Sequence, residues 1–209
     1  MTEKNGNEPT TLDAQLRTEK ARLFDGLPAD DGRMRFAVPD ARNVLMRGLR
    51  YYLGDKAVWL PEYDMVAEWL SENNGKGLLL YGNCGRGKTL ITQKILPEIF
   101  RWYLRKVLPL FTARDLNDRF TEVMQYKIVA IDDLGTEGDA MIYGNRRVFF
   151  SELVDDAERH GKTLIISTNL RRKRASGEPS IEERYGIRTL DRLRLLTRSV
   201  AFVGESLRR

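Results

Sequence analysis

The stretch LLLYGNCGRGKTLITQKIL, residues 78–96, decides the fold. It opens on an apolar run typical of a buried strand, and the apolar residues after its glycines recur at helical spacing. Glycines and basic residues lie between these two elements. Glycine permits backbone conformations in which successive N–H groups point at phosphate oxygens, and the following helix presents its positive N-terminal end to the same anion. The pattern therefore predicts a phosphate-binding loop between a strand and a helix.

The loop itself, GNCGRGKT at residues 82–89, matches the pattern G-x-x-x-x-G-K-[ST]. We expect Lys88 to reach the β and γ phosphates of ATP and Thr89 to ligate Mg²⁺. Cys84 is interpreted as a small spacer rather than a redox group. A glycine turn that matches by chance is the alternative, and the flanking strand and helix patterns weigh against it. The predicted nucleotide-binding residues are Gly82, Asn83, Cys84, Gly85, Arg86, Gly87, Lys88, Thr89 and Leu90.

A second buried strand, IVAIDDLG at residues 128–135, ends in two aspartates. Ligands of open α/β sheets bind at the carboxyl ends of the strands, and Mg²⁺ prefers oxygen ligands. We assign Asp132 to the Mg²⁺ shell and Asp133 to the attacking water, with Glu137 a weaker candidate for the second role. A polar turn after a strand is the alternative interpretation.

A third run, TLIISTNL at residues 163–170, is another buried strand with a polar end. If its strand lies between the loop strand and the acidic strand, Asn169 would lie near the γ-phosphate and report hydrolysis. Alternatively, Asn169 caps the next turn.

Arginines are concentrated near the C-terminus. Arg188 and Arg192 are four residues apart and share one face of a helix, from which one of them could reach ATP on a neighbouring subunit. A solvated basic face is the alternative. The run RRKR, residues 171–174, would contact DNA phosphates, with a solvated loop equally consistent. The sequence contains no metal-ligand cluster, nucleophile triad or membrane helix that would indicate a function other than an ATPase.

Short apolar runs alternate with amphipathic ones, which predicts an α/β fold with a parallel sheet. Expected strands are residues 77–81, 107–111, 128–131, 163–167 and 199–203. Expected helices are residues 88–104, 113–124, 143–160 and 181–196, preceded by helices at 11–24, from 39 onward and at 62–72.

The composition allows one main domain in 209 residues, with 42% hydrophobic residues and a formal net charge of +5. That charge permits contact with nucleic acid without requiring it. A single cysteine, no apolar run as long as a membrane span and no signal peptide together indicate a cytoplasmic protein.

These motifs, in this order and followed by the closing VAFVGESLRR, resemble AAA+ ATPases of the DnaC-type bacterial helicase loaders and the related IstB-type transposition helper ATPases. The resemblance covers roughly residues 50–208. It implies a P-loop NTPase sheet in the order 5-1-4-3-2. It also implies that Asp132 and Asp133 are the Walker B pair, that Asn169 is sensor 1 and that Arg192 is the arginine finger, with Arg188 second. Many AAA+ enzymes have Asp-Glu where this chain has Asp-Asp.

Residues 1–35 are expected to form a short leader that could dock a partner, and residues 36–209 the ATPase domain. Since the sequence ends close to the last expected strand, no helical lid is expected, and Arg208 has no assigned role. The expected function is the first of three, and the other two are alternatives. The first is a loader of the replicative DNA helicase that acts as a homo-oligomer on single-stranded DNA. The second is a target-selection ATPase that coats double-stranded DNA for a transposase, and the third is a nucleotide-gated scaffold with little hydrolysis.

Overall fold

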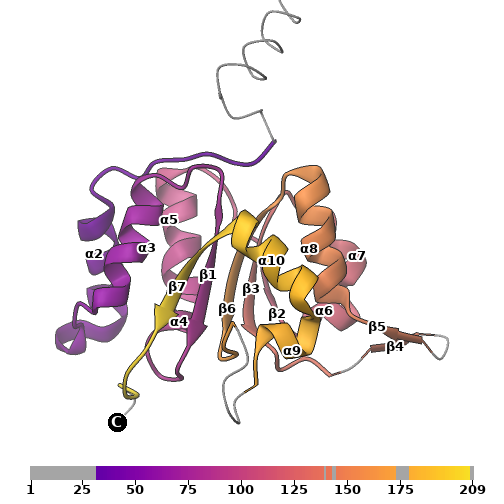
Figure 1. Cartoon of the computed structure of the whole chain (residues 1–209). Coiled ribbons are helices and arrows are strands. Elements are labelled where there is room, and N and C mark those ends of the chain that lie inside the picture. The colour runs from indigo at the N-terminus through magenta and orange to yellow at the C-terminus, as the bar shows by residue number, and fades with distance from the viewer. Residues whose placement is uncertain (1–31, 139, 143–144, 173–178, 208–209) are drawn as a thin grey trace, which may run out of the picture. The chain divides into compact units, whose positions relative to one another are not determined.

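The computed structural model describes residues 32–138, 140–142, 145–172 and 179–207. The helix predicted at residues 11–24 lies outside the described residues. A central sheet with helices on both faces makes up the described part, and the two helical layers are separated by the strands in Figure 1.

Five parallel strands form the sheet in the order β2-β3-β6-β1-β7. Numbered along the chain as five strands, this is the predicted order 5-1-4-3-2, which is confirmed. The strand of the third motif therefore lies between the loop strand and the acidic strand. The strands are β1 (Gly77–Gly82), β2 (Leu110–Thr112), β3 (Ile128–Leu134), β6 (Thr163–Thr168) and β7 (Thr197–Phe202).

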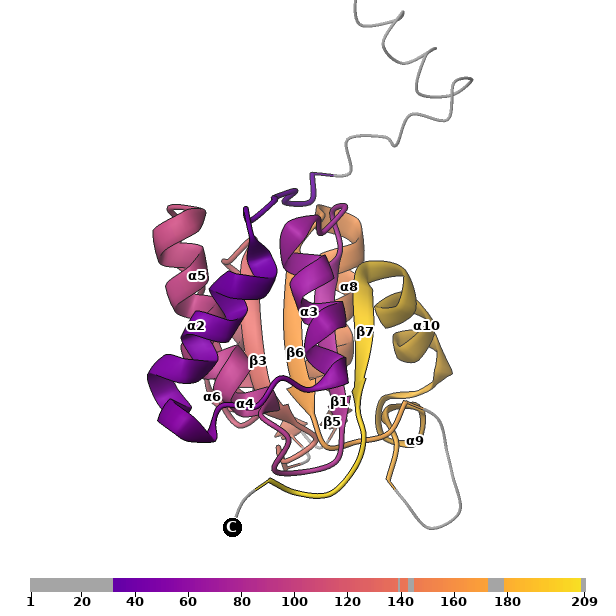
Figure 2. The same cartoon turned by 90° about the vertical axis from the view of Figure 1, so that its left-hand side faces the viewer.

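One face of the sheet is covered by the helices that flank the phosphate loop (Figure 2). Leu78 and Leu80 of β1 point into this layer, as alternation along a strand requires. The helix after the loop is continuous but contains one π turn. The elements are α2 (Ala41–Leu53), η1 (Gly54–Lys56), α3 (Pro61–Ser71), α4 (Lys88–Leu90), the π turn η2 (Ile91–Ile95) and α5 (Leu96–Tyr103).

The opposite face packs against a second core, to which β1 contributes Leu79. Both cores are apolar and fully covered, which explains why the strands read as continuous apolar runs. The helices of this layer are α6 (Asp115–Asp118), α7 (Phe120–Val123), α8 (Phe149–His160), α9 (Ile181–Tyr185) and α10 (Ile187–Leu196).

Two predicted helices are interrupted. The helix expected at 113–124 breaks at Arg119, whose φ of −126° and ψ of 26° are not helical. The helix expected at 181–196 breaks at Gly186, whose φ of 87° favours glycine. The strand expected at 107–111 begins later, at Leu110, because Pro109 has no N–H to donate to a neighbouring strand.

The helix expected at 143–160 is wrong at its start. Residues 145–147 instead form β5 (Asn145–Arg147), paired antiparallel with β4 (Ala140–Ile142), and the helix begins at Phe149. The apolar stripe of α8 starts at Phe149 and Phe150, while the residues one turn earlier are polar. A helix there would have no apolar face to bury.

Candidate nucleotide site

The phosphate loop between β1 and α4 depends on glycine at two crowded positions. Gly87 has a φ of +95° at the start of α4, and a Cβ there would lie 2.6 Å from the Tyr63 hydroxyl. Gly85 has a φ of +72°, and its Cβ would lie 2.0 Å from Ser206 Oγ. Any side chain at either position would strain the backbone and collide with a neighbour. The loop conformation is therefore specified by these two glycines.

Lys88 lies at the base of the loop and is 6% exposed. Its Nζ donates hydrogen bonds to the carbonyl oxygens of Gly82, at 2.9 Å, and Asn83, at 2.6 Å. An ammonium group with three donors is thus held inside the curve of the loop, where it can face an anion.

Helix α3 holds the loop from behind. The Arg86 guanidinium donates to Glu62 Oε1 through Nε, at 2.9 Å, and through a terminal nitrogen, at 2.6 Å, and both side chains are largely buried. The Tyr63 hydroxyl donates to the Arg86 carbonyl at 3.2 Å. Burial, together with the Glu62 carboxylate, raises the pKa of Tyr63 to about 12, while Arg86 opposes the shift. The sequence motifs gave no sign of these two α3 residues.

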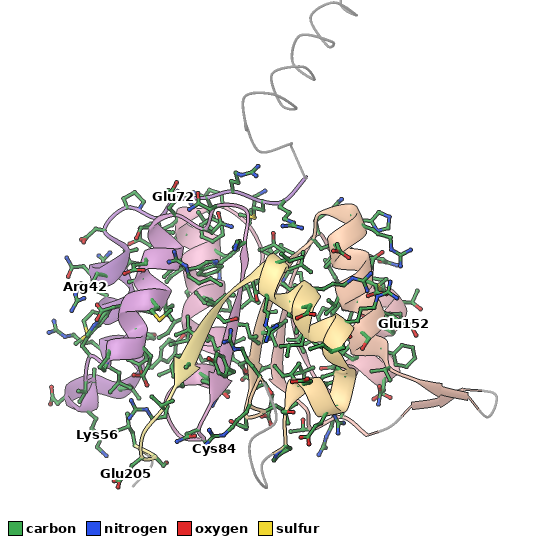
Figure 3. The ribbon with its side chains drawn as sticks, in the orientation of Figure 1. Arg42, Lys56, Glu72, Cys84, Glu152 and Glu205 are labelled. Carbon is green, nitrogen blue, oxygen red and sulfur yellow. The ribbon has the colours of Figure 1, made fainter. Side chains whose placement is uncertain are left out.

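The segment after β7 holds the loop from the other side. Asn83 Nδ2 donates to the Gly204 carbonyl at 2.8 Å, and the Leu207 N–H donates to the Gly85 carbonyl at 3.0 Å. Arg86 donates to the Glu205 carbonyl at 3.4 Å. Figure 3 labels Cys84 of the loop and Glu205 of this segment at the same edge of the molecule. The closing sequence motif is therefore physically part of the loop's surroundings.

A β-bulge of β3 contains both aspartates. The register moves from Ile131 opposite Ile166 to Leu134 opposite Thr168, so one extra residue of β3 stands against β6. Asp133 takes up this irregularity with a φ of +56°. Asp132 is buried and Asp133 is partly exposed, so the two carboxylates have different surroundings although they are adjacent in sequence.

Asp132 is 2% exposed and is held by two donors. Ser167 Oγ donates to its Oδ1, and Gln93 Nε2 of the π turn donates to its Oδ2 at 2.7 Å. Gln93 lies after the loop pattern, so a motif search overlooks it. It belongs to a π turn, and π turns often occur at functional sites. Its contact fixes the orientation of the Asp132 carboxylate.

Asp133 lies with Asn169 at the carboxyl edge of the sheet. Asn169 Nδ2 donates to Asp133 Oδ1 at 3.0 Å, and the Asp133 N–H donates to Ser167 Oγ at 3.1 Å. Asp133 and Asn169 both line a cavity of about 500 Å³ that also opens onto the phosphate loop. Its lining residues are Leu53, Tyr63, Cys84, Gly85, Gly87, Lys88, Thr89, Leu90, Gln93, Lys94, Asp133, Asn169 and Leu207.

The cavity brings together most of the predicted site residues, which come from the phosphate loop after β1, the end of β3 and the position after β6. Asp132 is not among its lining residues and lies behind Gln93. Within the described ranges no group of three or more His, Cys, Asp or Glu side chains could hold a metal ion by itself. The predicted Mg²⁺ ligands, the Thr89 hydroxyl and the Asp132 carboxylate, offer only oxygen. They would suit Mg²⁺ if phosphate oxygens completed its shell, which is its usual mode of binding.

Glu137 serves a different part of the molecule. Its Oε2 accepts from the Gly135 N–H at 2.8 Å, and its Oε1 accepts from Arg184 Nε at 3.1 Å and from the Tyr185 hydroxyl. Burial and the Glu137 carboxylate raise the pKa of Tyr185. Glu137 therefore ties α9 to the segment after β3 and does not line the cavity.

The two candidate finger arginines differ in their partners. Arg192 pairs with Asp155 and, at 2.5 Å through Nε, with Glu158, both on α8. Arg188 is exposed in the first turn of α10 and makes no ion pair with any other described residue. The structure thus leaves Arg188, and not Arg192, available for a contact outside the chain.

The predicted basic run is only partly described, since Lys173 and Arg174 lie outside the described residues. Arg171 pairs through its backbone with Ser180. The Arg172 guanidinium lies over the Tyr81 ring, 5.2 Å from its centroid.

None of the described helices is long and apolar enough to span a membrane. In comparisons with known proteins, no family model and no curated protein matches the chain.

Solved structures to which the chain is similar include the DnaC helicase loader, DnaI, and AMPPCP-bound DnaA from Aquifex aeolicus. The DnaC helicase loader is 17% identical, over 80% of this chain and 93% of that one, with a TM-score of 0.45. DnaI is 17% identical, over 86% of this chain and 90% of that one, with a TM-score of 0.47. DnaA is 15% identical, over 79% of this chain and 48% of that one, with a TM-score of 0.42.

Proposed function

We propose that this chain binds ATP and Mg²⁺ in the cavity at the carboxyl edge of the sheet and hydrolyses the nucleotide. One observation carries the proposal. A single cavity brings Lys88 and Thr89 of the loop together with Asp133 of β3 and Asn169, which directly follows β6. Phosphoryl transfer depends mainly on positioning and on stabilisation of charge, and this cavity offers groups for both.

The loop and the buried aspartate would bind the nucleotide and its metal. The backbone N–H groups of the loop and the Lys88 ammonium bind the phosphates. Thr89 and Asp132 would hold Mg²⁺, and Gln93 and Ser167, which donate to the Asp132 carboxylate, would fix its orientation. Bound Mg²⁺ neutralises the charge that develops on the phosphoryl oxygens.

Asp133 and Asn169 would act at the γ-phosphate. Asp133 orients the attacking water and accepts its proton. Asn169 already donates to one Asp133 oxygen at 3.0 Å, so it restricts the carboxylate to one orientation. Asn169 would also sense whether the γ-phosphate is present.

Hydrolysis would be completed by an arginine from a neighbouring copy in a homo-oligomer. The contacts favour Arg188 over Arg192, because the Arg192 guanidinium already binds two carboxylates of its own chain. A planar guanidinium matches phosphoryl oxygens, and such a residue acts mainly on turnover.

In the cell, we place this ATPase in the cytoplasm as a loader of the replicative DNA helicase. The support is the order of the sequence motifs, which resembles that of DnaC-type loaders. A target-selection ATPase that hands double-stranded DNA to a transposase is the second candidate, because the same motifs resemble IstB-type proteins.

The hydrolysis proposal is tested by steady-state turnover and nucleotide affinity in two variants. Asp133→Asn and Asn169→Ala should retain ATP affinity within a few-fold and lose roughly 100-fold or more of the turnover. A wild-type protein that binds ATP with no turnover would support the scaffold function instead.

The cellular role is tested by purifying the tagged protein from its native cells with ATP present and identifying its stoichiometric companion by mass spectrometry. A replicative helicase supports the loader role. A transposase would refute it in favour of target selection.

A further inference from the structure

A second cavity, of about 660 Å³, runs between α2 and α5 and shares no lining residue with the nucleotide cavity among the described residues. Four large aromatic side chains line it and are exposed to solvent: Tyr51 (82%), Tyr52 (39%), Trp102 (59%) and Tyr103 (42%). We call these four residues and the cavity between them the aromatic face. Exposed aromatic side chains in such a group mark an interaction site.

Close packing of the two helices creates this face. Gly48 of α2 meets Ile95, and a Cβ at Gly48 would lie 2.7 Å from Ile95 Cγ2. The apolar stripe of α2 turns inward at that crossing, and the aromatic residues of the last turn remain outside. Figure 2 shows α2 and α5 next to each other on the same face of the sheet. The aromatic residues therefore lie on rigid helices.

The aromatic face is surrounded by positive charge. Arg47 lines it and donates to the Tyr103 hydroxyl at 2.6 Å, and the Arg101 guanidinium lies 5.4 Å from the centroid of Trp102. Among the described lining residues Glu98 is the one acid, and it accepts from Trp102 Nε1 at 2.9 Å. Five exposed cations on or beside α2 and α5 form no ion pair with any described residue: Arg47, Arg50, Arg101, Arg105 and Lys106.

We propose that the aromatic face binds single-stranded nucleic acid. Proteins that bind single strands combine a positively charged groove with aromatic side chains on which successive bases stack. Both components are present here on the same two helices. Two copies of this chain joined through the same face would bring like charges together, which disfavours self-association as its role.

The site goes beyond the proposed ATPase and stands without it, because the residues of the two cavities differ. It also differs from the run at 171–174, where the contact to nucleic acid was expected from charge alone. The aromatic face would bind the bases as well as the phosphates. Bases are accessible for stacking in a single strand, so single strands should bind better than duplexes.

The test uses the full chain and an oligo(dT) of about 16 nucleotides, with an equal-length duplex for comparison. Binding is followed by tryptophan fluorescence and by anisotropy of a labelled strand, without nucleotide and with Mg·ATP. Trp102 should be the side chain quenched by stacking, since Trp69 is buried and Trp59 is half-buried. Trp102→Ala and Tyr51→Ala should each weaken single-strand binding roughly tenfold or more, and Trp102→Phe much less.

A charge-matched pair separates this face from general electrostatics. Arg50→Ala removes a cation beside the aromatic face, whereas Arg159→Ala removes an exposed one on α8, across the sheet. Only the first should weaken binding. The substituted side chains are exposed, so thermal melting should be unchanged in every variant.

Three results would overturn the proposal. The first is single-strand binding that is unchanged in Trp102→Ala and Tyr51→Ala but lost in Arg172→Ala. The second is duplex binding as tight as single-strand binding with no quenching. The third is no binding of oligo(dT) in either condition, which would leave the face to a protein partner.

Discussion

The ion pair between Glu62 and Arg86 offers the sharpest test of how the loop is held. Replacing Glu62 by Gln preserves the shape of the side chain and removes its charge. The Arg86 guanidinium would then lose the carboxylate that accepts two of its hydrogen bonds, at 2.9 and 2.6 Å, in a site where Glu62 is 7% exposed.

The cost follows from burial and from what remains. Removing one partner of a buried ion pair costs about 3–5 kcal/mol. Here glutamine can still accept one hydrogen bond, and Arg86 retains the Glu205 carbonyl at 3.4 Å, so we expect about 2 kcal/mol. For a domain of this size that corresponds to a fall in Tm of about 4–8 °C. Affinity for ATP should fall as well, because Arg86 belongs to the loop.

The matched control is Asp64→Asn on the same helix. Asp64 pairs with Arg42 at the surface, where the side chains are 44% and 61% exposed, so its loss should cost less than about 1 kcal/mol. Thermal unfolding and titration with a fluorescent ATP analogue would be measured for both variants. Equal shifts in Tm, or unchanged ATP affinity in Glu62→Gln, would refute the view that α3 fixes the loop.

Three further predictions follow from the same contacts. Gly87→Ala should abolish measurable ATP binding in a titration, because the new Cβ meets the Tyr63 hydroxyl at 2.6 Å and the φ of +95° disfavours any side chain. Since the pKa of Tyr63 is raised from 10.0 to about 12, its contribution to stability is present below pH 10 and is lost as the pH rises toward 12. The Tm of Tyr63→Phe should therefore fall less steeply than that of the wild type over this pH range, and equal slopes would contradict the assignment. Arg188→Ala should lower turnover with normal Tm, whereas Arg192→Ala should lower Tm, because Arg192 pairs with Asp155 and Glu158. A reversed pattern would return the finger role to Arg192.

Much of the fold could be predicted because its signals are local. Apolar runs of strand length with polar ends fix which strands are buried and where each one stops. Parallel strands bring those ends to one edge, so Asp133 and Asn169 meet although 36 residues separate them. The loop pattern also identifies its own glycines, lysine and threonine.

Other parts of the site could not be predicted because their contacts join segments without a shared pattern. The Glu62–Arg86 pair spans 24 residues, and the contact between Asn83 and Gly204 spans 121. The bulge that contains Asp132 and Asp133 depends on the pairing of β3 with β6, which the sequence of either strand alone does not specify. The β4–β5 hairpin is not predicted, because the apolar period of α8 can be continued in the sequence beyond its first phenylalanine, Phe149.

The central claim, that this loop binds the phosphates of ATP, is tested most directly by comparing two lysines of the same cavity. Lys88 is 6% exposed at the base of the loop, whereas Lys94 lines the cavity from an exposed position. Lys88→Ala should weaken binding of Mg·ATP roughly 10- to 100-fold, as expected for the loss of charged hydrogen bonds, and Lys94→Ala by only a few-fold. Equal affinity in wild type and Lys88→Ala, with both proteins folded, would contradict the account.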